Sequence, residues 1–337
     1  MRILLTVFWN SAEHRLRFFW RFLLHSVALV ASILVVSIAM GLAFLIFDGG
    51  DDLESSGWMW AFAVTQNLAL VLTVVAASIW PDRRTIGALG LRLNRRWWLD
   101  CGGGFVLGAL LMTMIFWVQW AMGWLEFELR STSWRDLFLN QGRWLVAMMA
   151  VGIGEEVLSR GHHLKNLCEG FRFLGLRASF VVASLISSGL FAAFHLFNPG
   201  ASIASSVSIF LAGVTFCVAR LKTGSLAAPI GLHFSWNYFQ GSVFGFSVSG
   251  NVFAGSLLQT TQSGPSFFTG GSFGPEAGLL GYAGFSLGLI VFFLWPKPEE
   301  KLAANLVQLC KRQSWPLKRI TSPLQFQSND PAGSGLR

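Results

Sequence analysis

Three short runs of the 337-residue sequence place ionisable or amide side chains within otherwise apolar stretches. The run at 155–160 carries two adjacent carboxylates and an arginine, the run at 191–195 ends on a histidine, and the run at 233–237 begins on a histidine and ends on an asparagine. A charged group near the centre of a membrane helix costs about 2.5–3.5 kcal/mol on insertion scales, so such residues mark candidate functional sites. Their joint occurrence on three segments predicts one site assembled inside a helix bundle.

The two carboxylates of the first run, Glu155 and Glu156, point about 100° apart on a helix and therefore cannot share one role. Glu156 and Arg160 are four residues apart with the acid N-terminal, which is the favourable order for an ion pair on one helix face. Glu155 is left as the unpaired carboxylate and is the candidate general base. In the alternative interpretation, both carboxylates are interfacial residues at the cytoplasmic end of the helix, held there by Arg160.

The histidines and the asparagine have a structural alternative as well. His195 alone could be a hydrogen-bonded packing residue, and His233 and Asn237, which share a helix face, could serve only in interhelical hydrogen bonds. The joint occurrence of the three runs favours a site. In that case the histidines are candidate proton carriers or metal ligands, and Asn237 is a candidate neutral donor to an oxyanion.

Other polar residues suggest structural roles. We expect Gln66, Asn67 and Gln119 to join helices by hydrogen bonds, and His162 and His163 to lie at the cytoplasmic interface. The GxSxG pattern at 284–288 lies within an apolar run and more plausibly provides a close-packing seam than a nucleophile elbow. The sequence contains no HExxH, which excludes a zincin site on a helix.

The elements that position these residues must be membrane helices. The chain is 53% apolar and only 12% charged, against about 25% charged in soluble domains, which excludes an ordinary cytosolic enzyme and a disordered chain. A membrane helix needs roughly 20 mostly apolar residues. Eight such runs lie near 22–47, 58–80, 101–124, 140–163, 178–198, 202–220, 224–246 and 277–295. The sequence therefore predicts an all-α fold, a polytopic membrane helix bundle of about eight transmembrane helices.

The distribution of charge predicts the orientation. Lysine and arginine collect on cytoplasmic loops, and here they precede the first span, follow the second and recur in the tail, whereas 247–276 contains neither. With eight crossings, both termini are expected in the cytoplasm. The formal net charge of +8 is scattered between apolar runs rather than gathered on one face, so no nucleic-acid partner is predicted.

The domain organisation follows from these spans. We expect a cytoplasmic or interfacial segment at 1–21, which could form a helix, a membrane-embedded domain at 22–298, and a basic cytoplasmic tail at 299–337 that begins with a short helix. Segment 248–276 is expected to be a long outer loop or a re-entrant stretch. The four cysteines have no CxxC pair or close spacing, so free thiols are predicted.

The three runs resemble the EExxxR, FxxxH and HxxxN motifs of the CPBP intramembrane proteases, a family named for CAAX proteases and bacteriocin-processing enzymes and also called Abi. They read Glu155-Glu156-x-x-x-Arg160, Phe191-x-x-x-His195 and His233-x-x-x-Asn237. The motifs span 155–237, about a quarter of the chain, and a looser likeness extends over roughly 140–295. Ser159 departs from the pattern, in which an aromatic residue commonly precedes the arginine.

The resemblance implies a CAAX-protease-like intramembrane endopeptidase, expected as a multi-pass protein of a prokaryotic plasma (inner) membrane. Its substrate would be a membrane-associated, prenylated or leader-type peptide, or a membrane protein, cleaved within the lipid bilayer or at its edge. The roles carried over are water activation by Glu155, assistance or metal binding by His195, oxyanion stabilisation by His233 and Asn237, and support of the site by Glu156 with Arg160.

The resemblance leaves the metal and the activity open. Catalytic Zn²⁺ usually has three protein ligands and a water, and only His195 and His233 are obvious ligands, so a metal-free mechanism with a glutamate-activated water competes with a metalloprotease. A non-catalytic membrane scaffold or bacteriocin-immunity factor, with 248–276 as its contact surface, is the main alternative. A transporter that relays protons through Glu155 and the histidines is a third possibility.

Overall fold

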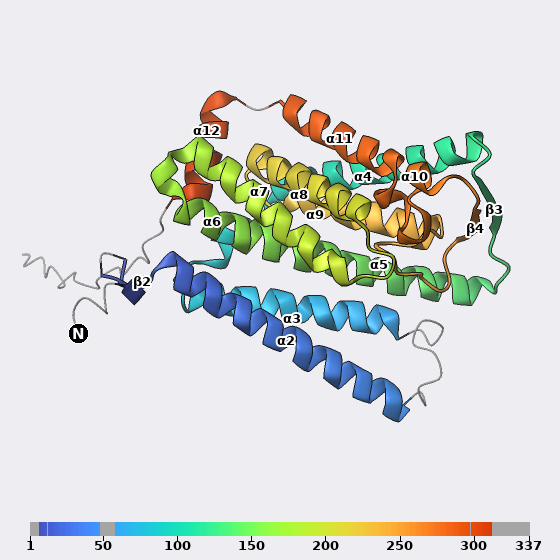
Figure 1. Cartoon of the computed structure of the whole chain (residues 1–337), viewed down its shortest axis with the longest axis horizontal. Coiled ribbons are helices and arrows are strands. Elements are labelled where there is room, and N and C mark those ends of the chain that lie inside the picture. The colour runs from blue at the N-terminus through green and yellow to red at the C-terminus, as the bar shows by residue number, and fades with distance from the viewer. Residues whose placement is uncertain (1–6, 12, 48–57, 297, 312–337) are drawn as a thin grey trace, which may run out of the picture.

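The structure, a computed structural model, describes residues 7–11, 13–47, 58–296 and 298–311. These residues form a helical bundle, shown in Figure 1, which confirms the predicted all-α polytopic fold. The helices are α2 (Phe18–Phe47), α3 (Met59–Ile79), α4 (Arg95–Ala121), α5 (Trp134–Glu156), α6 (Leu164–Gly170), α7 (Leu176–Phe194), α8 (Ile203–Thr223), α9 (Ala227–Asn237), α10 (Ser266–Thr269), α11 (Leu279–Leu294) and α12 (Glu299–Cys310). Two π-helical segments, Val157–His163 and Tyr238–Val243, directly follow α5 and α9.

Each of the eight predicted apolar runs contains a helix. Fewer than eight of these helices are long and apolar enough to cross a membrane. Within the described ranges, five helices are long and apolar enough to cross a membrane: α2, α3, α4, α7 with its 3₁₀ extension, and α8. The number rises to six if α11 and α12, which meet at 115°, are counted as one span. The predicted count of eight is therefore not confirmed.

Side-chain caps set where several helices begin. Asn94 accepts a hydrogen bond from the backbone N–H of Trp97 at the start of α4, and Ser133 does the same for Asp136 at the start of α5. Ser202 opens α8 with a capping box. Such caps satisfy backbone donors that lack a partner within the helix. Among the helices that carry the three motifs, α5 is the one with such a cap.

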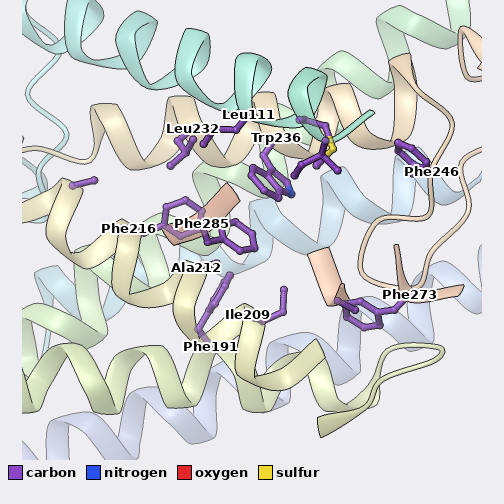
Figure 2. Packing of buried hydrophobic residues seen from close by; sticks show 14 of the residues in the cluster. Leu111, Phe191, Ile209, Ala212, Phe216, Leu232, Trp236, Phe246, Phe273 and Phe285 are labelled. Atoms are coloured by element: carbon purple, nitrogen blue, oxygen red, sulfur yellow. The ribbon is translucent and has the colours of Figure 1, made fainter. Parts of the chain in front are cut away.

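Close packing of α9 against α4 forms the centre of the bundle. A Cβ on Gly104 would lie 2.3 Å from the carbonyl oxygen of Ala228, and one on Gly231 would lie 2.0 Å from that of Cys101. Beside this contact Trp236 stacks on Phe285, with ring centroids 4.2 Å apart, in the apolar core of Figure 2. Gly284 packs against Trp236, as expected for a seam residue. Small residues thus let α9 sit deep inside the bundle.

Two short antiparallel sheets were not predicted. Strands β1 (Trp9–Asn10) and β2 (Arg15–Leu16) form a hairpin within the segment 1–21, for which a helix was considered, and α2 begins at Phe18. The hairpin turns Arg15 inward, where it pairs with Glu169. Strands β3 (Leu125–Leu129) and β4 (Leu258–Gln262) pair at the opposite end of the bundle (Figure 1) and fix the predicted loop 248–276 in place.

Helix α12 confirms the short helix expected at the start of the tail, while 312–337 lies outside the described residues. It packs on α6, where Lys165 donates a hydrogen bond to the carbonyl oxygen of Gln308 at 2.8 Å. Cys168 and Cys310 form a disulfide in this contact, so the prediction of free thiols is wrong for this pair, although Cys101 and Cys217 are free. The sequence separation of 142 between the paired cysteines explains why local spacing did not predict the disulfide.

A buried cluster of ion pairs joins the hairpin, α2, the loop after α3 and α6. Arg21 contacts Asp82 at 2.6 Å and Glu169 at 2.9 Å, and Arg84 bonds to the same two carboxylates. Burial by itself raises the pKa of each carboxyl. Arg84, His162 and Arg21 outweigh burial and hold the pKa of Asp82 well below its usual range, and Arg84, Arg21 and Arg15 lower the pKa of Glu169. The carboxylates therefore remain charged in the folded protein.

We expect this cluster to make the protein acid-sensitive. The pKa values of its carboxyls are lowered in the folded state. The contribution of the cluster to the free energy of unfolding is therefore complete above about pH 4, the pKa of these carboxyls in the unfolded chain, and is lost as the pH falls below that value. The melting temperature in detergent should therefore stay level from about pH 7 to 5 and fall below about pH 4. Asp82→Asn should lower the melting temperature at pH 7 and flatten the acid slope; an unchanged slope would assign the acid sensitivity to other groups.

Candidate active site

The first motif lies where α5 passes into a π-helical segment. The chain is helical without a break from Trp134 to Gly170, first as α5, then as the π segment Val157–His163, and then as α6. The helix thus continues beyond the predicted end of its span at 163. Such π segments occur frequently at functional sites. Here the segment begins directly after Glu156 and leaves both carboxylates in the interior of the bundle rather than at its end.

The predicted ion pair is present. Arg160 Nη1 lies 2.8 Å from Glu156 Oε1, and both side chains are fully buried. The guanidinium also lies over two aromatic rings, 4.4 Å from the centroid of Phe191 and 4.9 Å from that of Phe216. A cation over a ring face is stabilised by the negative face of the π system. Neither side chain is exposed, so the pair is an internal contact of the bundle.

Each histidine of the second and third motifs is held through one ring nitrogen. His195 follows the last residue of α7, and its Nδ1 lies 2.8 Å from the carbonyl oxygen of Phe191. His233 on α9 places Nδ1 3.1 Å from Glu156 Oε1 and stacks on Phe216, with ring centroids 5.1 Å apart. These contacts leave Nε2 of each ring free to face the cavity.

Glu155 brings the three motifs together. Its Oε2 lies 4.0 Å from His195 Nε2 and 3.8 Å from His233 Nε2. This oxygen is buried and has no hydrogen-bond partner. The linear sequence places Glu155 toward the cytoplasmic end of the fourth predicted span and His195 toward the outer end of the fifth. In the structure, the helix that carries Glu155 continues to Gly170, and the two side chains lie side by side.

A cavity of about 330 Å³ opens at this point. The predicted residues that line it are Glu155, His195, His233 and Asn237; Asn237 follows His233 on the same face of α9. Glu156 and Arg160 stand behind His233 and do not line the cavity. The six predicted site residues therefore divide into four that a substrate could reach and two that support them.

The sequence did not predict the polar cavity residues contributed by the loop before α11 and by the turn between α7 and α8. Glu276 lines the cavity and accepts a hydrogen bond from Ser249 Oγ at 2.7 Å and another from the backbone N–H of Ser249. Asn198 and Asn251 line it as well. The available signal was that Glu276 is an isolated acid at the edge of the last apolar run. Asn67, predicted to join helices, also lines the cavity and packs against Gly154.

A second cavity, of about 700 Å³, shares Glu155 and His195 with the first. It lies between α2, α3, α7 and the π segment, and most of its lining is apolar, including Ile33, Leu70 and Phe194. Ser159, the departure from the family motif, also lines it. The catalytic carboxylate candidate therefore stands where the two cavities meet.

Fold and site together define a polytopic helical membrane protein with a buried centre of carboxylates and imidazoles. Residues 138–239 match the family described as type II CAAX prenyl endopeptidase Rce1-like, and the match includes all three motifs. This match over 138–239 is consistent with the CPBP group and confirms the predicted resemblance to CAAX proteases. No curated protein and no solved structure matches the chain. The family supports an endopeptidase of the CAAX-protease type.

Proposed function

We propose that this protein is an intramembrane endopeptidase in which Glu155 activates the attacking water. The observation that carries the proposal is the unpartnered Oε2 of Glu155, which faces two imidazole nitrogens at the wall of the cavity. In this proposal the attacking water contacts both Oε2 and His195 Nε2, which are 4.0 Å apart. The water oxygen bonds to the scissile carbonyl carbon while its proton passes to Glu155. The same proton then protonates the departing amine as the C–N bond breaks.

The neighbouring residues position the water and stabilise the negative charge. His195 Nδ1 donates to the carbonyl oxygen of Phe191, so its Nε2 accepts a hydrogen bond from the water. Asn237 supplies a neutral donor to the oxyanion. His233, as an imidazolium that donates from Nδ1 to Glu156, supplies a second donor from Nε2. The ion pair with Arg160 fixes Glu156 and, through it, the ring of His233.

A metal ion is compatible with the same residues. Nε2 of His195 and of His233, together with Glu155 Oε2, form a donor set of the kind that holds catalytic Zn²⁺, and the Nδ1 contacts orient both rings as ligands usually are. A bound metal would supply Lewis-acid polarisation of a water or carbonyl. The proton transfers above describe the metal-free form.

The substrate we propose is a peptide with a long apolar attachment or segment, such as a prenylated C-terminal peptide or a hydrophobic leader. The larger cavity between α2, α3 and α7 has the volume and the mainly apolar lining to hold such a group beside Glu155. Ser159 leaves more room in it than an aromatic residue would. We further propose the orientation in which the end of the bundle holding the Arg21 cluster and α12 faces the cytoplasm, because basic residues favour that side.

Comparative proteomics of membrane peptides tests the proposed activity. Cells with the wild-type protein should accumulate cleaved products that are missing in cells with Glu155→Ala at equal protein level. A protein whose biological effect survives in Glu155→Ala and His195→Ala but is lost on changes in loop 248–276 would instead be a scaffold or an immunity factor. In that case the proposed peptidase activity would be rejected.

A further inference from the structure

Three histidines outside the active site converge from two distant segments. His25 lies in the first half of α2, and His162 and His163 end the π segment that follows α5. One ligand nitrogen from each ring lies within 4.8 Å of the others. All three side chains are at most 3% exposed. The depth predicted for His162 and His163, at the cytoplasmic interface, stays a prediction.

The ring nitrogens in this cluster have no partners that would explain their burial. Both nitrogens of His25 and the Nδ1 atoms of His162 and His163 are buried without a hydrogen bond. The rings of His25 and His162 have centroids only 3.9 Å apart. Buried polar atoms are almost always hydrogen-bonded or bound to an ion, so four unpartnered nitrogens at one point indicate a ligand.

A carboxylate fixes the orientation of one of these rings. His162 Nε2 lies 3.4 Å from Asp82 Oδ2, so a hydrogen on Nε2 points to Asp82 and the lone pair of Nδ1 points away from it. Asp82 is itself bonded to Arg21, Arg84 and Asn166 and acts through His162 rather than as a ligand. A histidine backed by a carboxylate is the usual arrangement at metal sites.

We propose that His25, His162 and His163 bind a divalent transition metal, most suitably Zn²⁺, as a structural site. Neutral imidazoles favour zinc, copper and nickel over magnesium and calcium. Tetrahedral zinc holds nitrogen ligands at about 2.0–2.1 Å, which sets them about 3.3 Å apart. Since the three nitrogens lie within 4.8 Å of one another, the rings would draw together by up to about 1.5 Å, and a water would complete the shell. The site is closed to solvent and distinct from the centre at Glu155.

The metal would join α2 to the segment that carries the active-site residues. The most apolar window of α2 is only 11% buried, so this helix has little packing of its own against the bundle. His163 follows Arg160 by three residues on the π segment. A metal bound here therefore fixes one wall of the larger cavity, to which α2 contributes Ile33 and Ser37.

Metal binding to the full-length protein tests the proposal apart from any peptidase activity. The protein is purified with a tag that contains no histidine. The double variant His195→Ala with His233→Ala removes the active-site imidazoles. Of the six histidines of the chain, this variant keeps only His14 and the three of the cluster. Titration with Zn²⁺ or Co²⁺ should give one tight equivalent, and X-ray absorption should show three imidazole nitrogens at about 2.0–2.1 Å. Fewer than three imidazoles, or no tight equivalent, would overturn the proposal.

Single substitutions in this double variant then assign the ligands. His25→Leu and His162→Asn should each weaken binding more than about 100-fold, and Asp82→Asn by about 10–100-fold, as for an outer-shell partner. His14→Asn is the matched control, because His14 is exposed and should leave binding unchanged. Equal affinity in all four variants would reject the site. If a cluster variant does not fold, the X-ray absorption measurement on the double variant still decides.

Discussion

Replacing Glu155 with glutamine is expected to lower kcat/KM for peptide hydrolysis by about 10²–10⁴-fold, the usual contribution of a positioned general base. Glutamine keeps the size of the side chain but cannot take up the proton of the attacking water. Glu155 Oε2 has no hydrogen-bond partner, and the carboxylate takes no part in the Glu156–Arg160 pair. The loss should therefore appear in kcat with little change in melting temperature.

The measurement uses the purified full-length protein in lipid vesicles with a substrate identified by the peptide comparison above. Glu128→Gln on the exposed face of β3 is the matched control and should retain the wild-type rate. Glu276→Gln provides a second comparison, because Glu276 is the other carboxylate that lines the cavity. Full activity in Glu155→Gln combined with a large loss in Glu276→Gln would transfer the role of base to Glu276.

The part of the site that could be predicted from sequence is the part encoded by local spacing. The four-residue separation of Glu156 and Arg160 predicted their ion pair because side chains four apart share a helix face. The position of His195 and His233 on separate apolar runs predicted that they face an interior site, since isolated polar groups in membrane helices rarely face lipid. The structure places both within 4.0 Å of Glu155.

What could not be predicted depends on contacts between distant segments. Arg15, Arg21 and Arg84 count as cytoplasmic loop charges in the sequence, yet all three are buried against Asp82 or Glu169. Nothing in local spacing reveals that partners up to 154 residues apart will meet. The same holds for the Cys168–Cys310 disulfide, the β3–β4 pair and the approach of His25 to His162.

The π segment after α5 is a further limit of prediction from sequence. Helical periodicity assumes 3.6 residues per turn, and a π segment shifts every later residue around the axis. Regular periodicity therefore does not predict that His162 and His163 point into the bundle toward His25 of α2. The direction of side chains can be predicted from spacing only up to Arg160, where the regular geometry ends.

Removal of the Arg160 side-chain charge should have the largest effect on stability. Arg160→Met leaves the carboxylate of Glu156 fully buried, with His233 as its one remaining charged partner in the described structure. Loss of one member of a buried ion pair typically costs about 3–5 kcal/mol, whereas replacement of both members by uncharged groups is often close to neutral. We therefore expect Arg160→Met to lower the free energy of unfolding by about 3–5 kcal/mol, and Glu156→Gln with Arg160→Met to recover a large part of it.

Unfolding of the protein from mixed micelles by increasing amounts of an anionic detergent measures these differences. Arg172→Met is the matched control, because Arg172 is exposed in the turn after α6 and its loss should change stability by less than about 0.5 kcal/mol. The double variant should regain stability but not activity, since His233 then lacks the carboxylate that orients it. If Arg160→Met costs no more than Arg172→Met, the ion pair does not hold the site together, and the orientation of His233 must come from its stacking on Phe216.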